Sequence, residues 1–259
     1  MIARGLHDWW RARRVLARPG AFARVRRAGV PGALYRFLLR DGRAVYLRGG
    51  SRDFHVFHRV FVRDEYCLGG LDLGPESTVV DIGAHSGLFA LRVAADAGRI
   101  VCVEPAPENL ALLRRHVSEN GLEARVAVVA AAVHGAHTDL ELVRGGDPYA
   151  HAVRERESES TLPAVRGLTL AGLFEEHAVR RCALLKLDCE GSEFRILEEA
   201  GAATLRACTR IRLEFHAANA PEAPARLRRH LESHGFLVER FHRKPRSDQG
   251  YIFCARRDA

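Results

Sequence analysis

Several common protein classes are excluded by what this 259-residue sequence lacks. It contains no run of about 18 consecutive apolar residues, the length that a membrane-spanning helix requires. Its six cysteines form no C-x-x-C pair, so their spacing favours reduced, mostly buried thiols over a zinc site or a disulfide framework. The beginning of the chain lacks the apolar core and the small-residue cleavage site of a secretion signal. We therefore expect a cytoplasmic protein.

Lysine is nearly absent as well, because 38 of the 40 basic residues are arginine. This bias suggests GC-rich coding at least as much as selection for a binding surface. The formal charge of +8 is nevertheless uneven: residues 1–48 hold twelve arginines and two aspartates, a charge of +10, which leaves −2 for the remainder. We expect at most a weak contact between these N-terminal arginines and an anionic surface. A helix face that carries Trp9 and Trp10 beside arginines is compatible with binding to a membrane surface. Packing of this face onto the protein's own core is favoured instead.

The chain is predicted to divide into a basic helical N-terminal appendage, residues 1–43, and a main α/β domain, residues 44–259. Trp, Leu, Val and Arg recur at helical spacing through residues 1–40, which predicts two or three short helices. A strand-like run at 44–47 and a helix over 55–61 follow.

From Val79 onward, apolar strand-like runs alternate with helical segments. The expected strands cover residues 79–82, 100–104, 126–130, 183–187, 210–215, 236–240 and 250–255. The expected helices cover residues 87–96, 107–120, 169–179, 191–200 and 222–234. This alternation predicts a Rossmann-like α/β fold whose sheet is mostly parallel and ends in a C-terminal antiparallel hairpin strand. The polar, aperiodic segment 145–162 is predicted to be a loop that covers a pocket.

The end of the first strand of this domain carries the pattern Asp81-x-Gly83-x-x-x-Gly87, with His85 inside the turn. Glycine lets the backbone approach a ligand closely. A dinucleotide fingerprint would require G-x-G-x-x-G, which binds a pyrophosphate and accompanies NAD-dependent oxidoreductases. Here an acid stands before the turn, which suits a cationic ligand without phosphate. S-adenosylmethionine, with its sulfonium and ammonium groups, is such a ligand.

The second strand ends in Glu104 followed by Pro105. A carboxylate at this place accepts hydrogen bonds from ribose hydroxyls. The pair of strand ends therefore predicts a nucleoside pocket of the methyl-donor type.

Acidic residues also follow the fourth strand, at Asp188, Glu190 and Glu193. Ligands of open α/β sheets bind beyond the carboxyl ends of the strands, so Asp188 and Glu190 are expected to face the pocket. Glu193 falls in the first helical turn, where it either complements the helix dipole or has a functional role. Lys186 is expected to pair with a neighbouring carboxylate.

The fifth strand carries Glu214 and His216, which alternation places on one face. Together they are suited to hold a substrate hydroxyl, to act as a general base, or to bind a divalent metal.

The segments VVDIGAHSGLFALRVA, VCVEPAPENLALLRRHVSENG, LTLAGLFEEHAVRRCALLKLDCEGSEFRILE and IRLEFH resemble successive blocks of the FkbM-type methyltransferases, over roughly residues 44–255. The resemblance implies a class I S-adenosylmethionine-dependent fold and O-methylation of sugars, polyketides or other natural products. It implies that the donor site comprises Asp81, Gly83, His85, Gly87, Glu104 and Pro105. It implies that the acceptor side comprises Asp188, Glu190, Glu193, Glu214 and His216. His85 departs from the asparagine common in the family. Arg52-Asp53 resembles an upstream block, so these two residues are expected to bind the substrate and help to close the pocket.

The predicted reaction is methyl transfer to a hydroxyl of a small or medium acceptor. Asp188 and His216 are the candidate bases, between which the sequence does not choose, and a metal that lowers the hydroxyl pKa is a less favoured alternative.

A nucleic-acid methyltransferase is a competing interpretation, suggested by a pI of 9.6. However, Asp147-Pro148-Tyr149 lacks one proline of the D-P-P-Y tetrad, and Cys189 lacks the proline–cysteine arrangement of cytosine enzymes. We therefore expect a nucleic-acid acceptor less than a small molecule. A non-catalytic nucleoside-binding module of the same fold is the other alternative.

Overall fold

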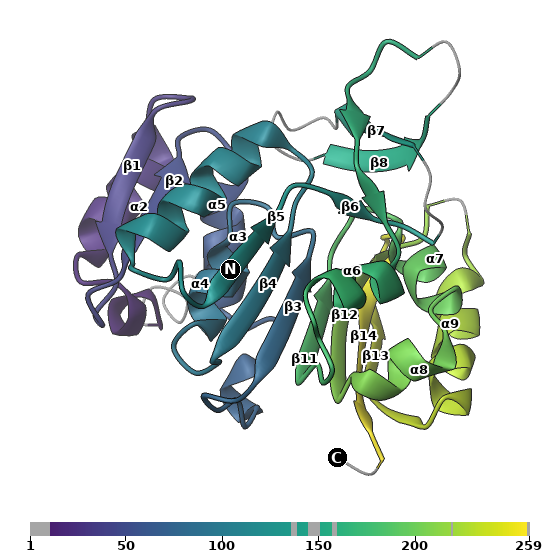
Figure 1. Ribbon diagram of the computed structural model, residues 1–259. Helices are drawn as coiled ribbons and strands as arrows, with labels where there is room; N and C mark the ends of the chain where they lie inside the picture. The colour runs from purple at the N-terminus through teal and green to yellow at the C-terminus, as the bar shows by residue number, and fades with distance from the viewer. Residues whose placement is uncertain (1–10, 136–138, 145–150, 157–159, 219, 258–259) are drawn as a thin grey trace.

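A twisted mixed sheet lies at the centre of the computed structural model, which describes the chain apart from residues 1–10, 136–138, 145–150, 157–159, 219 and 258–259 (Figure 1). In the described residues this sheet has seven strands, in the order β13-β14-β12-β11-β3-β4-β5. They are β3 (Thr78–Ile82), β4 (Arg99–Val103), β5 (Val126–Val129), β11 (Leu184–Leu187), β12 (Arg210–His216), β13 (Phe236–Arg243) and β14 (Gln249–Arg256). All seven predicted strands are present.

The direction of the strands confirms the predicted fold class. Strands β5, β4, β3, β11 and β12 pair in parallel, and β14 is antiparallel to both β12 and β13. The chain runs outward from β3 through β4 to β5 and then returns to β11 on the other side of β3. A crevice forms beyond the carboxyl ends of the strands at such a switch point.

Helices cover both faces of this sheet (Figure 1). They are α4 (Leu88–Val93), α5 (Pro107–Glu119), α6 (Leu170–Glu176), α7 (Glu193–Glu198), α8 (Ala202–Ala207) and α9 (Ala223–Ser233). Alternate strand residues belong to opposite cores: Val79 packs with α4 and α5, whereas Val80 packs with α6 to α9. Burial on both faces explains why the parallel strands are almost continuously apolar. Helix α8 was not predicted from the sequence.

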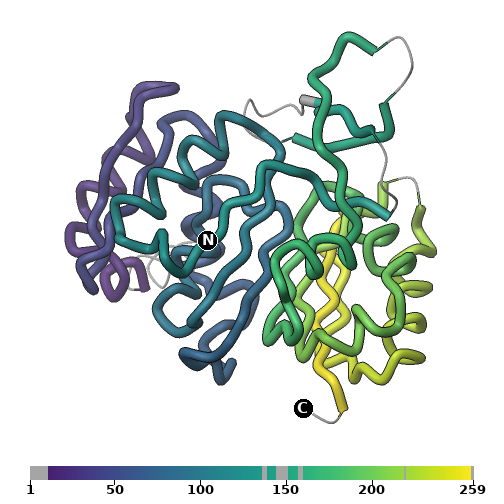
Figure 2. Tube along the Cα trace, in the orientation of Figure 1, coloured from purple at the N-terminus to yellow at the C-terminus, as the bar shows by residue number. Residues whose placement is uncertain are grey.

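The N-terminal segment differs from the prediction. After α2 (Pro19–Ala28), residues expected to be helical form β1 (Leu34–Leu38), which pairs antiparallel with β2 (Ala44–Arg48). The division predicted at residues 43 and 44 therefore falls inside a hairpin. Figure 2 shows this segment lying along α5. Trp9 and Trp10 lie outside the described residues.

Aromatic packing explains why this hairpin is part of the main body. The ring of Phe22 on α2 lies 5.4 Å from that of Phe37 on β1, 5.2 Å from Phe54 and 5.1 Å from Phe57, between centroids. The last two belong to α3 (Asp53–Phe57), which continues into a π-helix, His58–Val62, and a 3-10 turn follows at Leu68–Gly70. The predicted helix over 55–61 is thus present.

The segment after β5 forms two small sheets. Strand β6 (Ala132–Val133) pairs in parallel with β10 (Gly167–Leu168). Strands β7 (Leu140–Arg144), β8 (His151–Glu155) and β9 (Ala164–Val165) form the second, in the order β8-β7-β9. The prediction of an irregular loop over 145–162 was wrong for β8. Asp147, Pro148 and Tyr149 lie outside the described residues.

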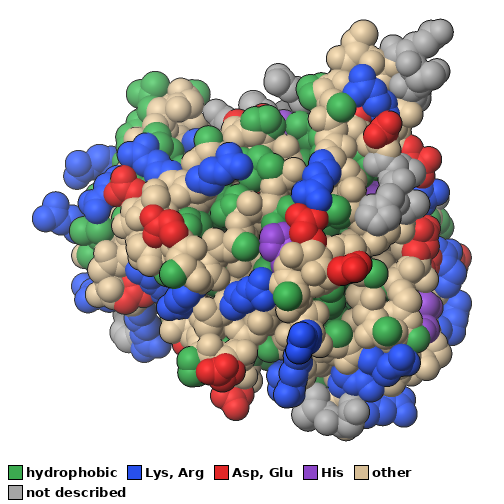
Figure 3. Space-filling model, in the orientation of Figure 1, with side chains coloured by type: hydrophobic (Ala, Val, Ile, Leu, Met, Phe, Trp, Pro, Cys, Tyr) green, Lys and Arg blue, Asp and Glu red, His purple; other side chains and the backbone are tan. Residues whose placement is uncertain are grey.

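Across the described ranges, none of the helices combines the length and the apolar character that a membrane span needs. Figure 3 shows Lys and Arg side chains over the end of the molecule formed by the N-terminal segment and also at the lower right of the view.

Candidate active site

A cavity opens at the carboxyl ends of β3, β4, β11 and β12. Its walls include the turn after β3, the residues after β4, the start of α3 with the π-helix, and β8. This is the place at which open α/β sheets bind their ligands.

The glycine turn joins β3 to α4 at the edge of this cavity. Gly83 has a φ of 73°, and a Cβ there would lie 2.0 Å from the carbonyl oxygen of Asp188. Gly87 has a φ of 83°, and its Cβ would lie 2.3 Å from the side chain of Leu113. Gly83 and His85 line the cavity, whereas Gly87 only lets the turn enter α4. Gly87 was expected to help form the donor site, but in this structure it packs closely against Leu113 instead.

Asp81 lies behind the cavity wall and not in it. Its side chain is fully buried and forms an ion pair with Lys186, with 2.9 Å between Oδ1 and Nζ. Nζ also donates a hydrogen bond of 2.7 Å to the carbonyl of Gly83. Burial opposes the charge on Lys186, but Asp81 raises its pKa, so the ammonium persists. Asp81 thus holds Lys186, which in turn holds the glycine turn.

Glu104 faces the cavity with its carboxylate fixed from behind. Oε2 accepts a hydrogen bond from the backbone N–H of His85 (2.9 Å), and Oε1 accepts from the N–H of Ala106 (3.0 Å) and from Nδ2 of Asn109 (3.2 Å). Burial raises the pKa of Glu104, and these donors oppose the rise. A carboxylate has about four acceptor positions, so three donors leave room for a ligand hydroxyl. Pro105 lines the cavity beside it.

Asp53 holds Arg48, which connects the N-terminal hairpin to the Glu104 carboxylate. It is fully buried and accepts two hydrogen bonds of 2.8 Å from the Arg48 guanidinium, at Nε and Nη2. Arg48 Nη1 donates to Oδ1 of Asn109 (2.9 Å), which itself donates to Glu104. Asp53 was predicted to contact the substrate. Both of its carboxylate oxygens instead accept hydrogen bonds from Arg48, so its role in this structure is structural. The neighbouring Arg52 is exposed and lines the cavity.

His85 is neutral at physiological pH. Burial lowers its pKa to about 4, and the nearby Arg48 adds to this effect although Asp53 opposes it. Its Nδ1 lies 3.2 Å from the hydroxyl of Ser86, and its Nε2 lies 3.5 Å from Arg48. The imidazole therefore forms part of the polar cavity wall without contributing charge.

Asp188 enters the cavity from the end of β11 as a carboxylate. Tyr66 donates a hydrogen bond of 2.8 Å to its Oδ2, and Oδ1 has no hydrogen-bond partner among the described residues. Burial would raise the pKa of Asp188, but Lys186, Arg59 and His216 lower it below its ordinary value. An ionised oxygen is thus available to accept a proton.

Glu193 organises the turn between β11 and α7 and is itself fully buried. It accepts hydrogen bonds of 2.9 Å from the backbone N–H groups of Cys189 and Gly191. Its Oε1 also lies 3.1 Å from Nδ1 of His216, whose Nε2 is 3.5 Å from Glu190. Glu193 was expected to contact the substrate, but it instead holds His216 in place.

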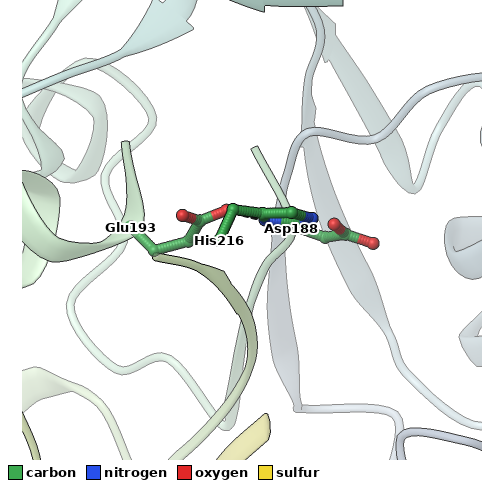
Figure 4. Close-up of side chains that lie close together, drawn as sticks. All are labelled: Asp188, Glu193 and His216. Carbon is green, nitrogen blue, oxygen red and sulfur yellow. Dashed lines mark hydrogen bonds and ion pairs between the residues drawn. The ribbon is translucent and has the colours of Figure 1, made fainter. Parts of the chain in front are cut away.

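His216 is held as a cation. Burial would lower its pKa, but the hydrogen bond to Glu193 and the charges of Glu193, Asp188 and Glu190 raise it to about 9. Figure 4 shows His216 lying between the Glu193 and Asp188 side chains. A protonated imidazole donates and cannot act as the base at neutral pH.

Asp188, Glu193 and His216 also form a set of possible metal ligands, because one atom of each lies within 4.8 Å of the others. Oxygen and nitrogen atoms of this kind suit a divalent cation. However, the Nδ1 of His216 and both Glu193 oxygens already have hydrogen-bond partners. A metal would have to replace the proton of His216 and this hydrogen bond.

Glu214 reaches the cavity from β12 within a network of charges. Arg59, on the π-helix, donates to Glu214 and to Glu65, and Lys244 donates to the other oxygen of Glu214. Tyr251 donates to Glu65 and accepts a hydrogen bond of 3.2 Å from Arg59. Both Glu214 oxygens are thus occupied, which favours a positioning role. A π-helix turn is frequent at functional sites.

Four residues of the site were not predicted, because they come from segments without a recognisable motif: Arg48, Arg59, Tyr66 and Lys244. The predicted carboxylate partner of Lys186 is present. Five predicted residues lie together at one cavity: Glu104, Asp188, Glu190, Glu214 and His216.

The strand order and the cavity at its switch point define a class I methyltransferase fold. The chain belongs to the methyltransferase FkbM domain family, whose model matches residues 81–238. A curated relative, the AMB antimetabolite synthetase AmbE of Pseudomonas aeruginosa, is 38% identical over 68 residues. This stretch covers 26% of the chain and 3% of the synthetase, so the chain spans a small part of that relative.

Solved structures show similar chain paths at low identity. An rRNA methylase of Streptococcus thermophilus has a TM-score of 0.48 and 11% identity, covering 76% of this chain and 95% of that one. A Streptococcus pneumoniae protein described as a putative tRNA methyltransferase, solved with S-adenosyl-L-methionine, has a TM-score of 0.46 and 16% identity, covering 75% of this chain and 71% of that one. A precorrin-6y methyltransferase of Geobacter metallireducens has a TM-score of 0.44 and 18% identity, covering 76% of this chain and 88% of that one. Such likenesses concern the path of the chain and say nothing of this protein's substrate.

Proposed function

We propose that this methyltransferase transfers the methyl group of S-adenosylmethionine to a hydroxyl oxygen of a small or medium acceptor, such as a sugar, a polyketide or another natural product. The observation that carries the proposal is the division of one cavity into two ends. One end holds the fixed carboxylate of Glu104, and the other holds the ionised Asp188 beside the His216 cation.

Glu104 binds the ribose hydroxyls of the donor, and the turn from Gly83 to His85 lies against its amino-acid part. The geometry favours this because the Glu104 carboxylate is oriented by three donors before any ligand binds. Preorganisation lowers the entropy cost of binding. The bound donor supplies a methyl group already activated by the sulfonium.

Asp188 accepts the acceptor's hydroxyl proton while the carbon–oxygen bond forms and the carbon–sulfur bond breaks. Tyr66 holds one oxygen of Asp188, and the free oxygen receives the proton. Most of the acceleration comes from orientation, which is worth on the order of 7–11 kcal/mol when two reacting groups are well aligned. The His216 cation and Glu190 position the acceptor.

The acceptor end favours a polyhydroxylated molecule, because it presents both hydrogen-bond donors and acceptors. Arg52, Arg59, His216 and Gln249 line it together with Asp188 and other carboxylates. The similarity to part of an antimetabolite synthetase supports a natural-product acceptor. We also propose that the protein is cytoplasmic, because its six cysteines are free and free thiols persist in a reducing compartment.

RNA methylation is the second candidate. The charge of +10 in residues 1–48 favours it, because phosphate contacts dominate nucleic-acid affinity. A non-catalytic module of the same fold is disfavoured by the retained Asp188 carboxylate in the cavity.

Calorimetric titration with S-adenosylmethionine, and with NAD as the control, tests the donor. We expect stoichiometric micromolar binding of the first alone, followed by turnover in a screen of sugars and hydroxylated natural products. Glu104→Ala should weaken donor binding about 10- to 100-fold, as expected for hydrogen bonds to a charged group. The Asp188→Asn variant, which changes the other end of the cavity, serves as the matched control and should bind the donor normally. Unchanged donor affinity in Glu104→Ala would disprove the ribose assignment.

A further inference from the structure

Exposed apolar side chains are concentrated in the N-terminal segment. Of the five large apolar side chains that are exposed among the described residues, three lie within residues 30–38: Val30 (63% exposed), Leu34 (40%) and Leu38 (41%). The other two, Leu237 and Phe241, belong to β13 at the edge of the main sheet. A single exposed apolar side chain is normal, but a group of them marks a surface for a partner. The group at residues 30–38 therefore points to an interaction surface.

Strand β1 presents two of these side chains on one face. Side chains alternate along a strand, so Leu34, Arg36 and Leu38 share the face opposite to the buried ring of Phe37. All three are exposed. Leu34 and Leu38 lie about 13 Å apart along the strand, with Arg36 between them. The open face of β1 is therefore an apolar row with a cation at its centre.

Helix α5 covers the neighbouring strand on this side of the hairpin and leaves β1 exposed. Tyr46 of β2, directly opposite Arg36, is buried and packs with Leu112 of α5. Its hydroxyl accepts a hydrogen bond of 3.2 Å from Nε of Arg36. The guanidinium of Arg115, also on α5, lies 4.1 Å from the centre of the Tyr46 ring. One tyrosine thus holds two guanidinium groups at the border between α5 and the open face of β1.

The segment that carries this face is strongly basic. Residues 11–40 contain nine arginines and no lysine, histidine, aspartate or glutamate. All nine arginines are exposed. Arginine keeps its charged group in water or among headgroups while its aliphatic stem follows apolar side chains. Apolar side chains among arginines are the combination that binds the surface of an anionic bilayer.

A nucleic acid suits this face less well. Proteins that bind single-stranded nucleic acids stack the bases on accessible aromatic rings. Between residues 11 and 40, the rings of Phe22 and Phe37 are buried in the core, and the Tyr35 hydroxyl accepts a hydrogen bond from the backbone N–H of Val30. Exposed leucines contribute nothing to phosphate contacts, whereas their burial in lipid is favourable.

We propose that the face of β1 formed by Leu34, Arg36 and Leu38 docks on the surface of an anionic phospholipid bilayer. The two leucines enter the boundary between headgroups and acyl chains, and the surrounding arginines pair with lipid phosphates. The contact is peripheral and reversible. None of these three residues lines the cavity, so the proposal is independent of the methyl donor and of the acceptor.

Co-sedimentation with large unilamellar vesicles tests this surface. Vesicles that contain about 30% phosphatidylglycerol should bind the wild-type protein at low ionic strength, whereas vesicles of phosphatidylcholine alone should not. The double variant Leu34→Ser/Leu38→Ser should bind about tenfold more weakly, because two apolar side chains no longer enter the bilayer. Arg36→Gln should bind about fivefold more weakly, the effect of one basic residue near an anionic surface.

Leu237→Ser is the matched control, because it removes a side chain that is even more exposed (58%) from β13. It should leave vesicle binding unchanged, and thermal unfolding checks that every variant folds. The proposal is overturned if the wild type does not bind the anionic vesicles, or if the double leucine variant binds them equally well. Binding to oligouridine in place of the vesicles would assign the face to a nucleic acid. A dimer in gel filtration that the double leucine variant converts to a monomer would assign it to a second copy of the chain.

Discussion

The protonation states of Asp188 and His216 distinguish their proposed roles in the reaction. Residue types alone left Asp188 and His216 equivalent as candidate bases. The structure separates them, because three carboxylates surround His216 and keep its proton, whereas cations around Asp188 keep that carboxyl ionised. Pairs of titratable groups whose environments push their pKa values apart point to different chemical roles. These opposite shifts support our proposal that Asp188 accepts the proton.

Asp188→Asn should lower kcat about 100- to 10,000-fold, the usual contribution of general base catalysis. The amide is nearly the same size but cannot accept the proton. Donor affinity, measured by calorimetry, should stay within about twofold because Asp188 is proposed to contact the acceptor. Tyr66→Phe, which removes only the hydrogen bond to Asp188, should have a smaller effect. Full turnover of Asp188→Asn would exclude Asp188 as the base.

The raised pKa of His216 predicts a loss of both stability and activity at high pH. A group whose pKa is higher in the folded state stabilises the protein fully below its unfolded pKa of 6.5, and this stabilisation disappears as the pH rises towards about 9. The contribution is on the order of 3 kcal/mol. Measured from pH 6 to 10, the melting temperature should fall between about pH 6.5 and 9, and kcat should fall around pH 9. His216→Gln should remove both dependences. A kcat that rises with pH up to about 9 would instead identify His216 as the base.

At the scale of elements, the N-terminal hairpin is linked by hydrogen bonds to the proposed donor pocket. Two asparagines, Asn109 in α5 and Asn120 directly after it, are among the residues that link β2 to this helix. Asn109 accepts from Arg48 and donates to Glu104, whereas Asn120 bonds both backbone groups of Ala44. The first of these links ends at the carboxylate proposed to bind ribose, and the second does not.

Asn109→Ala should therefore weaken donor binding about tenfold, because Glu104 loses one of its three donors. Asn120→Ala is the matched control: it also loosens β2 from α5 and should lower the melting temperature, but it should leave donor affinity unchanged. Calorimetry and thermal unfolding of both variants separate the two effects. Equal losses of donor affinity would mean that the hairpin acts only through general stability.

These elements also show what a sequence can predict. The seven strands of the main sheet were predictable because their apolar runs repeat with helices between them. Strand β1 was not, because its pairing and the Phe22 cluster depend on contacts with α3. The site motifs identified which residue types gather at the strand ends. They did not reveal that Asp81, Glu193 and Asp53 face inward, since their partners Lys186, His216 and Arg48 come from other elements.

Across the whole molecule, the excess of positive charge lies mainly outside the cavity. The cavity combines cations and carboxylates, while residues 1–48 hold the excess of arginine. A small acceptor would meet only the cavity. An RNA acceptor would in addition meet the arginine surface, because its phosphates extend beyond the reacting base.

The combined substitution of Arg24, Arg26 and Arg27 by glutamine distinguishes these cases. All three are exposed on α2, so their replacement should not disturb the fold. For a small hydroxylated acceptor, kcat/KM should remain within about twofold of the wild type, since surface substitutions rarely propagate to a buried site. Binding to anionic vesicles at low salt should weaken if the segment contacts an anionic surface, because that attraction depends on the removed charges.

For an RNA acceptor, kcat/KM of the same variant should fall. The slope of log affinity against log salt should also decrease, by about 0.7 for each single-strand phosphate that the three arginines no longer neutralise. This outcome would replace the small acceptor by a nucleic acid and leave the assignment of the methyl donor intact, because the donor end of the cavity does not involve α2.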